Sequence, residues 1–517
     1  MAADEKMKDS LMSTTAAEPQ YKVLIGMEIH VQLATKSKMF TGAANGFGGE
    51  PNSQVDPVIL GLPGVLPVVN KRAVEMAMMV GLALNCQIAS QTKWDRKSYY
   101  YPDLPKNYQI SQYDQPLCGP GSIELPLSDG STKTVRIRRA HLEEDAGKLL
   151  HEAGMTDSLV DLNRAGTPLL EIVTEPDLSS PEEARLFGEE LRRICRYLGV
   201  SHGIMQQGHM RFEPNINLHI YHNGKTVKTA ITEVKNLNSF RSVERACGYE
   251  IQRQLTEFFA NPEAAVSQGK STRGWDDDKG MTLLQREKEE AHDYRYFPDP
   301  DLVPLHVDSG WVNDIRSGVV ELPIARRKRY QEKLGLTAKE AFSLTEEREV
   351  ADLFDRAAAL GAPARRLTNL FLGPAAKMAN EAASAEAATV LISDLPVTDK
   401  QYAKLAELIE SGGISATSAV TVFEYLVKNL DADPAEAART LGLVQVRDQS
   451  QTEAWVMQAL TGNPQAVSDY KNNPKKKQAS LGFLRGAVMK ASQGKADPKL
   501  VGEILEARLN ALAADGA

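Results

Sequence analysis

The residues with the most evident chemistry are carboxylates and imidazoles in unusual surroundings. The stretch Arg139–Lys148 places three consecutive carboxylates, Glu143, Glu144 and Asp145, between basic residues. Adjacent carboxylates repel one another unless water or a cation neutralises them. An isolated acidic triplet is usually a solvated turn, so this stretch alone does not establish a metal site.

Two apolar runs strengthen the case for a bound cation. Glu28 and His30 lie within the run 23–33, and the two-residue period of a strand places both side chains on one face. Glu171 lies within the apolar run 169–173, where burying an unpaired carboxylate would be costly. A cation would offset that cost. Carboxylates from several strands suit Mg²⁺, whereas the imidazole leaves Mn²⁺ or Zn²⁺ open as well.

Composition describes an ordinary globular protein. The 517 residues are 42% hydrophobic, which is enough to bury the cores of about two to four domains. A net charge of −8 argues against uniform coating of nucleic acid, although one basic domain could still bind RNA. Scattered cysteines without a CxxC pair indicate reduced thiols and a cytoplasmic protein. No run approaches the ~20 apolar residues that span a bilayer.

The chain divides by composition into a tail and three domains. Residues 1–20 are acidic, lack an apolar stretch and are predicted to form a disordered tail. Residues 21–298 mix strand-like runs, helices and dense Gly and Pro, which predicts one α+β domain. Residues 299–413 and 414–517 are predicted to be two helical domains joined by a hinge at Gly412-Gly413.

Helical periodicity and capping residues predict the main helices. Ser180 and Glu183 form a capping-box pattern around Pro181, and Gly199 ends the helix that follows. Its apolar stripe leaves the intervening charged residues on a solvated face. The predicted helices cover residues 70–86, 180–198, 239–260, 346–360, 365–372, 400–410 and 501–512.

An aromatic and basic run at residues 94–108 is either a corner of the core or a substrate loop. Pro102 and Pro105 make a regular strand across the run unlikely. Tyrosines beside lysines and arginines suit base stacking and phosphate contact. Residues 292–298 have a similar composition. The candidate substrate-binding residues of the two runs are Arg96, Lys97, Tyr101, Lys106, Tyr108, His292, Tyr294 and Arg295.

Familiar nucleotide motifs are missing from the sequence. Gly269-Lys270-Ser271-Thr272 resembles the end of a P-loop, but Ala264 stands where the first glycine is needed. The sequence also has no GxGxxG, HExxH or GxSxG motif, so bound ATP would need a less familiar pocket. In the C-terminal part, a basic patch is either a solubilising face or a surface for the phosphates of tRNA. It comprises Lys475, Lys476, Lys477, Arg485, Lys490, Lys495 and Lys499.

Several ordered motifs resemble the B subunit family of the aspartyl/glutamyl-tRNA(Asn/Gln) amidotransferases. The resemblance rests on residues 25–30, 101–110, 141–148, 163–171, 235–240, 292–298 and 483–490. It covers nearly the whole chain from Tyr21. It implies a cradle-shaped catalytic domain, a helical domain and a helical tail that contacts tRNA.

The resemblance also implies an ATP-dependent carbon–nitrogen ligase with glutamine as the amide-nitrogen donor. ATP would phosphorylate the side-chain carboxylate of Glu-tRNA(Gln), Asp-tRNA(Asn) or both, and ammonia would displace the phosphate. Such phosphoryl transfer needs Mg²⁺ and positive charge around the phosphates. Ammonia would come from an amidase-type A subunit, held in a heterotrimer by a small C subunit. The sequence of this chain has no amidase-type serine motif and no activated cysteine.

By resemblance, the family's metal-site positions fall on Glu28, His30, Glu143 or Glu144, and Glu171, which are the expected catalytic residues. Glu213 is a further expected metal ligand, in place of the family's aspartate.

Two departures from the family pattern bear on function. Thr41, Ala43, Asp56 and Ile59 stand at the positions of four zinc-binding cysteines, so we expect no structural zinc. Gln206 and Gln207 replace two glutamates. This second departure slightly favours an alternative, a catalytically silent tRNA-binding scaffold. The archaeal E-type paralogue is excluded, because residues 305–410 hold only helical sequence where its inserted domain would lie.

Overall fold

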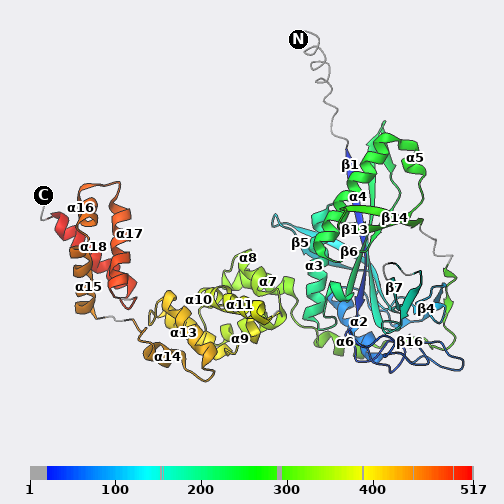
Figure 1. Cartoon of the computed structure of the whole chain (residues 1–517), viewed down its shortest axis with the longest axis horizontal. Coiled ribbons are helices and arrows are strands. Elements are labelled where there is room, and N and C mark those ends of the chain that lie inside the picture. The colour runs from blue at the N-terminus through cyan, green and yellow to red at the C-terminus, as the bar shows by residue number, and fades with distance from the viewer. Residues whose placement is uncertain are drawn as a thin grey trace, which may run out of the picture. The chain divides into compact units, whose positions relative to one another are not determined.

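The computed structural model describes residues 20–151, 154, 156–287, 294–386, 389–445, 448–492 and 494–514. The chain forms two compact units, Met1–Leu322 and Pro323–Ala517. Strands and helices make up the first unit, and helices make up the described part of the second (Figure 1). The predicted α+β class with a helical C-terminal part is confirmed. No described helix is long and apolar enough to cross a membrane.

A nine-stranded sheet dominates the described part of the first unit. Its order is β14-β13-β12-β10-β1-β9-β6-β5, with β11 paired to β10. Neighbouring strands are antiparallel, except that β12 and β13 are parallel. The strands are β1 (Tyr21–Gln32), β5 (Gly121–Pro126), β6 (Thr132–Glu144), β9 (Pro168–Thr174), β10 (Met210–His222), β11 (Lys225–Lys228), β12 (Thr232–Lys235), β13 (Ser271–Asp276) and β14 (Met281–Glu287).

The two faces of β1 have different surroundings. Met27 and Ile29 are buried on one face, and Ile29 pairs with Phe212 of β10. The Phe212 ring lies 5.3 Å from the ring of Phe240, the first residue of α4. Helices therefore cover this face. The alternate residues, including Glu28 and His30, project from the opposite face of the sheet.

Three longer helices pack in this unit, two of them along one side of the sheet (Figure 1). They are α2 (Lys71–Ala83), α3 (Pro181–Tyr197) and α4 (Phe240–Ala260), close to the predicted limits. Ser180 caps α3 by accepting from the Glu183 N–H, as predicted. The Glu183 carboxylate accepts from the Ser179 N–H at 2.6 Å, so the reciprocal half of the capping box is shifted by one residue.

Smaller sheets and short helices complete the first unit. The run 94–108 contributes β3 (Asp95–Ser98) and the first residue of β4 (Tyr108–Ser111), and both prolines lie between these strands. β3 pairs with β4 and with β15 (Phe297–Pro298), which brings the two aromatic runs together. The remaining elements are β2 (Gln91–Thr92), β7 (Lys148–His151), β8 (Ser158–Asp161), η1 (Met205–Gln207), α5 (Pro262–Ser267), β16 (Leu305–His306) and α6 (Ser309–Ser317).

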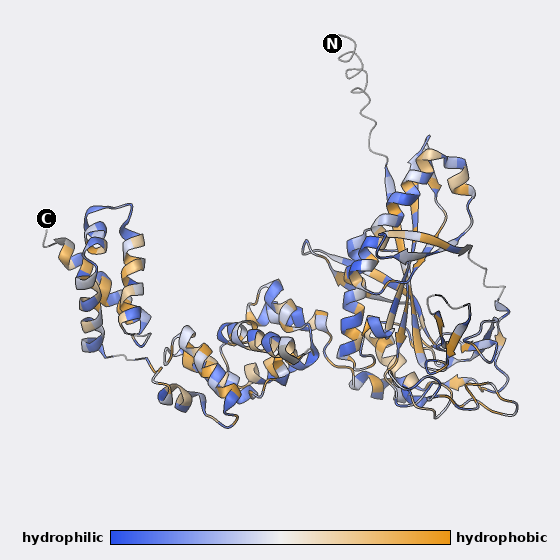
Figure 2. Cartoon of the chain, viewed as in Figure 1, coloured by the Kyte–Doolittle hydropathy of each residue, from blue (hydrophilic) through white to orange (hydrophobic). Residues whose placement is uncertain are grey.

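The described residues of the second unit form two separate hydrophobic cores. One core joins residues from Tyr330 to Ala438, and the other joins residues from Val456 to Leu509. Figure 2 shows hydrophobic residues alternating with hydrophilic ones along these helices. Ile414 and Phe423 belong to the first core. Packing therefore continues across Gly412-Gly413, where the sequence predicted a hinge, and the change of core lies after residue 438.

The helices α9, α10, α12 and α18 lie close to the predicted ranges 346–360, 365–372, 400–410 and 501–512, and the other helices of the second unit were not predicted individually. The first core is built from α7 (Pro323–Leu334), α8 (Ala338–Leu344), α9 (Arg348–Ala359), α10 (Ala364–Leu370), η3 (Phe371–Ala375), α11 (Ala376–Glu386), η4 (Ile392–Asp394), α12 (Asp399–Glu410), α13 (Ala416–Lys428) and α14 (Pro434–Thr440). The second is built from α15 (Gln449–Gly462), α16 (Pro464–Asn472), α17 (Lys477–Ala491) and α18 (Pro498–Ala514).

Candidate functional site

Strand register gathers carboxylates and imidazoles on the face of the sheet opposite α4. Glu28 of β1 pairs with Glu213 of β10, and His30 pairs with Glu171 of β9. Glu171 pairs in turn with His141 of β6. Residues directly opposite in neighbouring strands project from the same face, so the pairings place these side chains in one continuous row.

The row contains three overlapping groups whose possible metal-ligating atoms lie within 4.8 Å of one another. Glu28 and Glu171 each belong to two of the groups, so the groups form one cluster. We call this the carboxylate row. Its members are Glu28, His30, His141, Glu143, Glu171, Glu213 and Glu233.

Distances within the row suit the ligands of a divalent cation. The Nε2 atom of His30 lies 3.6 Å from both Glu143 Oε1 and Glu171 Oε2. The Nε2 atom of His141 lies 3.4 Å from Glu171 Oε2 and 4.0 Å from Glu143 Oε2. Ligand atoms bound about 2.0–2.2 Å from one ion are separated by comparable distances. His30 and His141 also each bury an Nδ1 atom that has no hydrogen-bond partner among the described residues.

Electrostatics within the row show an excess of negative charge. Burial opposes charging of His30, but the hydrogen bond and charge of Glu171, with the charge of Glu213, raise the pKa of His30 to about 9. Burial also opposes charging of Glu171, but the neighbouring His141 and His30 hold its pKa well below the usual value. Burial and the charge of Glu171 raise the pKa of Glu28 to about 7. A cation in the row would compensate this charge. The carboxylate oxygens suit Mg²⁺, and the imidazole nitrogens leave Mn²⁺ or Zn²⁺ open as well.

The three acidic residues of the 143–145 triplet have different surroundings. Glu143 is 2% exposed and belongs to the carboxylate row. Glu144 forms an ion pair with Lys106 and accepts from the Ile110 N–H at 2.9 Å, so it links β6 to β4. The structure thus brings Glu143, and not Glu144, together with the other expected ligands. Glu144 belongs to none of the three groups of possible metal ligands.

Asp145 holds two guanidinium groups beside the row. Arg211 donates from Nη1 to Asp145 Oδ2 at 2.8 Å and from Nη2 to Oδ1 at 3.2 Å. The Nε of Arg164 lies 3.6 Å from the same carboxylate. Gln32 Nε2 donates to it at 3.0 Å. Burial disfavours the charged form, but Arg211 and Arg164 outweigh that effect and lower the pKa of Asp145 to about 2.

The sequence-based prediction missed His141 and Glu233. His141 stands two residues before Glu143, so alternation along β6 places both on one face. That signal was available in the sequence. Glu233 lies in the short strand β12 and joins the row through its pairing with Asn215 of β10. This long-range pairing carries no signature in the sequence.

The aromatic run of residues 94–108 contributes one cation to the surroundings of the row. Burial opposes charging of Lys97, but the neighbouring carboxylates of Glu143 and Glu171 outweigh it and raise the pKa of Lys97. Its Nζ lies 5.1 Å from the centroid of the Tyr294 ring. Lys97 therefore combines an aromatic contact with the negative potential of the row.

Other predicted substrate-binding residues make internal contacts. Arg96 donates to Asp299 at 2.8 Å and to Asp301 at 2.9 Å, and its guanidinium lies 4.3 Å from the centroid of the Tyr108 ring. Tyr101 is 57% exposed, and Arg295 is also exposed. His292 lies outside the described residues. Their roles in substrate binding stay predictions.

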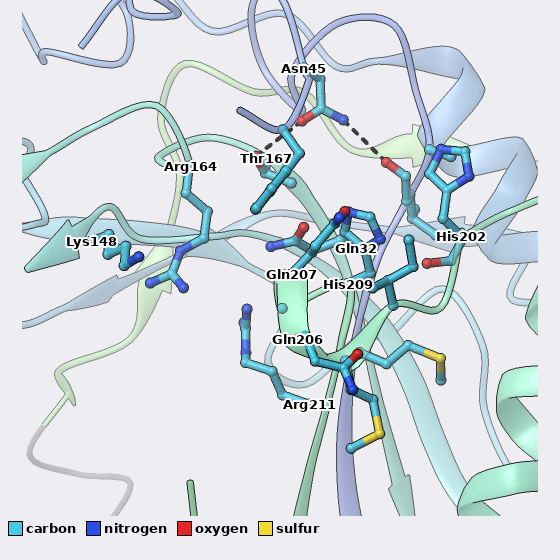
Figure 3. A pocket seen from close by; sticks show the side chains of 18 of the residues that line it. Gln32, Asn45, Lys148, Arg164, Thr167, His202, Gln206, Gln207, His209 and Arg211 are labelled. Carbon is cyan, nitrogen blue, oxygen red and sulfur yellow. Dashed lines mark hydrogen bonds between the residues drawn. The ribbon is translucent and has the colours of Figure 1, made fainter. Parts of the chain in front are cut away.

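A cleft of about 880 Å³ adjoins the carboxylate row at Glu213. Figure 3 shows side chains that line this cleft. Glu213 and Lys235 contribute to its lining, and Lys235 Nζ donates to Glu213 at 2.6 Å. The cleft is lined by cations, carboxamides and aromatic rings. These include Gln32, Asn45, Phe47, Lys148, Arg164, His202, Gln206, Gln207, His209 and Arg211.

Gln206 and Gln207 lie in η1 and line this cleft. Neither replaces a carboxylate of the three groups, which are complete without them. The observation that favoured a silent scaffold therefore does not weaken the carboxylate row.

The loop at the positions of the zinc-binding cysteines is held by hydrogen bonds. Thr41 Oγ1 donates to Asp56, and Asp56 Oδ1 accepts from the Ile59 N–H at 3.0 Å. Asp56 belongs to none of the groups of possible metal ligands found among the described residues. The absence of structural zinc stays a prediction.

The basic patch of the tail lies on and around α16, α17 and α18. Lys476 lies 3.3 Å from Asp469, and Arg485 donates to Glu506 at 2.5 Å. Lys475, Lys490 and Lys499 are exposed, whereas Lys495 is half-buried. Exposed lysines on neighbouring helices suit sequence-independent phosphate contact.

Comparisons with known proteins agree with this arrangement. A family model described as the GatB/GatE catalytic domain matches residues 23–313, and one described as a GatB domain matches residues 352–509. Three relatives are named as the B subunit of an aspartyl/glutamyl-tRNA(Asn/Gln) amidotransferase. They come from Thermomicrobium roseum, Caldicellulosiruptor saccharolyticus and Carboxydothermus hydrogenoformans and are 47%, 46% and 44% identical. Each match covers 95% of this chain and 99% of the relative.

Proposed function

The chain belongs to the B subunit family of the aspartyl/glutamyl-tRNA(Asn/Gln) amidotransferases, and on this basis we propose that it carries the ATP-dependent activation step. It is a subunit of a tRNA-dependent amidotransferase. The side-chain carboxylate of Glu-tRNA(Gln), Asp-tRNA(Asn) or both is phosphorylated by ATP, and ammonia displaces the phosphate to leave the amide. The amide nitrogen comes from glutamine.

The carboxylate row is the observation that carries this proposal. Mg²⁺ takes six ligands and keeps some of its waters, so a subset of Glu28, His30, Glu143, Glu171 and Glu213 would hold it, with His141 and Glu233 as alternative ligands in the overlapping groups. When bound, Mg²⁺ neutralises the negative charge of the transferring phosphate. Phosphoryl transfer depends on positioning and positive charge more than on a nucleophilic side chain. A row of fixed ligands beside a cleft with cationic side chains is suited to that task.

Side chains of the cleft position the reacting groups. Arg164 and Arg211 are held side by side through Asp145, and one carboxylate leaves the pair with net positive charge. Both line the cleft and keep N–H groups beyond those that Asp145 and the backbone occupy. They therefore orient an anionic group, either a phosphate or the substrate carboxylate. Lys97 adds an ammonium group in the negative potential of Glu143.

The partners follow from the same family membership. Ammonia is supplied by an amidase-type A subunit, and a small C subunit joins the two chains in a heterotrimer. The tail contributes tRNA affinity through its exposed lysines. The four free cysteines, which are all buried, suit the reducing cytoplasm.

Reconstitution tests this function. The full chain is combined with A and C partners, ATP, Mg²⁺, glutamine and tRNA carrying glutamate or aspartate, and amidated aminoacyl-tRNA is measured. We expect amide only when ATP and this chain are both present. Amide that forms equally well without ATP, or none with a partner set whose glutaminase is active, would overturn the proposal.

A further inference from the structure

A buried carboxylate joins α4 to the edge of the sheet, on the face opposite the carboxylate row. The side chain belongs to Glu250 of α4, which is 0% exposed. Its carboxylate accepts from Arg253 Nε at 3.0 and 3.1 Å, from Gln254 Nε2 at 3.0 Å and from Thr282 Oγ1 at 3.1 Å. None of these four residues belongs to the carboxylate row or lines the cleft. A fully buried carboxylate is costly unless it is paired and hydrogen-bonded, so these contacts hold it in one position.

Hydrogen bonds around Glu250 extend to three strands of the sheet. Thr282 lies on β14, and its Oγ1 also accepts from Arg273 Nε of β13 at 2.8 Å. The Nη2 atom of Arg273 donates to Thr282 O at 2.9 Å. Gln254 Nε2 donates to Ile216 O of β10 at 3.1 Å. We call these side chains the anchoring cluster. Its members are Glu250, Arg253, Gln254, Arg273 and Thr282.

The short strand β12 lies between two strands that the anchoring cluster holds. It pairs with β10 at two positions and with β13 at four. The cluster holds β10 through Ile216 and β13 through Arg273. Because β12 has few pairings of its own with β10, its position depends on where β13 lies. The cluster therefore helps to set the position of β12 relative to the centre of the sheet.

β13 connects the anchoring cluster to the carboxylate row. Arg273 belongs to the cluster, and the preceding residue, Thr272, donates from Oγ1 to Glu233 Oε2 at 2.9 Å. Thr272 and Glu233 are 1% and 3% exposed. Glu233 forms one of the three groups of possible metal ligands with Glu28 and Glu213. Consecutive residues of β13 thus contact the cluster and a possible metal ligand, so a shift of this strand would move the ligand.

We propose that Glu250 is a positioning residue for Glu233, which it holds in the carboxylate row through β13 and Thr272. This inference rests on the function proposed above, in which the row holds the metal ion. Glu250 itself touches neither the row nor the cleft. Side chains that orient a ligand without binding the ion still change metal affinity, because they fix the geometry of the ligand.

Binding of Mn²⁺ to the full-length chain, followed by electron paramagnetic resonance without nucleotide, tests the inference. Glu250→Gln removes the charge at nearly constant volume, and Thr282→Val removes only a hydroxyl group from the cluster. Thr282→Ser keeps that hydroxyl and is the conservative control. Phe258→Leu is the control for packing, because Phe258 is 0% exposed on α4 but lies outside the cluster. Thermal unfolding shows which variants are folded and how stable they are.

We expect Glu250→Gln and Thr282→Val each to weaken Mn²⁺ binding about tenfold, at the lower end of the effects of such supporting side chains. Thr282→Ser and Phe258→Leu should bind Mn²⁺ as the parent does, even where stability falls. If Glu250→Gln does not fold, Thr282→Val decides the question. Parent-like binding by the folded cluster variants would overturn the inference. Equal weakening by Phe258→Leu would also overturn it, because the effect would then follow stability alone.

Combination with Glu233→Gln tests the route of the effect. Glu233→Gln should itself weaken Mn²⁺ binding, and adding Thr282→Val should then cause almost no further loss, because both changes act on the same ligand. A further loss of about tenfold would show independent effects and contradict the inference. A parent chain that binds no Mn²⁺ would overturn the metal assignment and this inference with it. Binding is measured without partners or turnover, so the result is separate from that of the amidation assay.

Discussion

The carboxylate row and the basic patch of the tail are both rich in charge, but they are built differently. In the row, buried and half-buried side chains from β1, β6, β9, β10 and β12 are fixed by strand register, and they perturb the pKa values of one another. In the patch, mostly exposed lysines of one sign lie on short helices. Chemistry needs fixed ligands, whereas affinity for a phosphate chain needs only a local density of charge.

Removing one ligand from the row should have the largest effect. Glu171 belongs to two of the three groups, so Glu171→Gln removes charge from both. We expect amide formation to fall about 100-fold or more, because a lost ligand removes several kcal/mol of charge stabilisation in the transition state. The measurement is ATP-dependent amide formation by the reconstituted enzyme.

Two controls accompany this variant. Glu124→Gln changes an exposed carboxylate of the same sheet and should leave the rate unchanged. The basal glutaminase activity of the partner should also survive in Glu171→Gln. Normal amidation by Glu171→Gln would show that the row is not the metal site.

Changing Asp145, which holds the guanidinium groups of Arg164 and Arg211, should have the second largest effect. Asp145→Asn leaves Arg164 and Arg211 without their shared counter-ion, and we expect about a tenfold rise in KM for ATP or for aminoacyl-tRNA. Thermal and urea unfolding should also show a loss of stability of about 1–3 kcal/mol at neutral pH. If Asp145→Asn loses stability but keeps the KM values of the parent, Asp145 stabilises the fold and does not contribute to substrate binding.

The stability effect of Asp145 should depend on pH in a defined direction. The folded-state pKa of about 2 lies below the ordinary aspartate value of 3.8, so the stabilisation is present above about pH 4. It is lost as the pH falls toward 2. The stability difference between the parent and Asp145→Asn should therefore be constant from about pH 5 to 8 and should shrink below about pH 4. A difference that grows on acidification would contradict this origin.

Charge reversal in the basic patch should weaken tRNA binding without affecting chemistry. The variant changes Lys475, Lys490 and Lys495 to Glu. The slope of the logarithm of the tRNA-binding constant against the logarithm of the salt concentration should become shallower by about two to three. Reversing the exposed Lys225, Lys228 and Lys270 of the first unit is the matched control. An unchanged slope in the tail variant would leave the patch with a solubilising role.

Truncation after Gln445 tests the same region while keeping the first helical core, which extends to Ala438. We expect a higher KM for tRNA, and basal, tRNA-independent glutaminase activity of the partner should continue. A truncated enzyme that binds and amidates tRNA as well as the full chain would assign the tail another task.

Treatment with a chelator that removes zinc should have no effect on the stability of the chain, because we expect no structural zinc. Hydrogen bonds of Thr41 and Asp56 hold the loop that carries zinc-binding cysteines in the family pattern. Dialysis of the tag-free chain against a weak chelator should leave its thermal unfolding unchanged. Stoichiometric zinc that survives this dialysis would contradict the prediction.

Local features of the fold were predictable from the sequence, and long-range ones were not. Alternation in β1 placed Glu28 and His30 on one face, and capping by Ser180 located the start of α3. The pairing of Glu28 with Glu213 joins residues from distant parts of the chain, so no local pattern reveals it. The same applies to Glu233. Its strand is short, and its place in the row depends on β10.

The acidic triplet of residues 143–145 shows what the sequence could not predict at a single site. Sequence alone left Glu143 and Glu144 as alternatives, because neighbouring residues in a strand differ only in the face from which they project. The register of β6 against β9 and the nearby Lys106 separate them in the structure. The likeness to the family supplied the rest of the ligand set, while His141, which alternation would have indicated, was overlooked.

Binding of Mn²⁺ to the full-length chain, followed by electron paramagnetic resonance, tests the carboxylate row most directly. The parent should bind Mn²⁺ in the absence of nucleotide. Glu171→Gln should weaken that binding about tenfold or more, because loss of even an outer-shell partner of a metal ligand costs about 10- to 100-fold in affinity. Glu144→Gln should bind as the parent does, because Glu144 is paired with Lys106. Equal binding by the parent and Glu171→Gln, or weakening by Glu144→Gln alone, would contradict the assignment of the row.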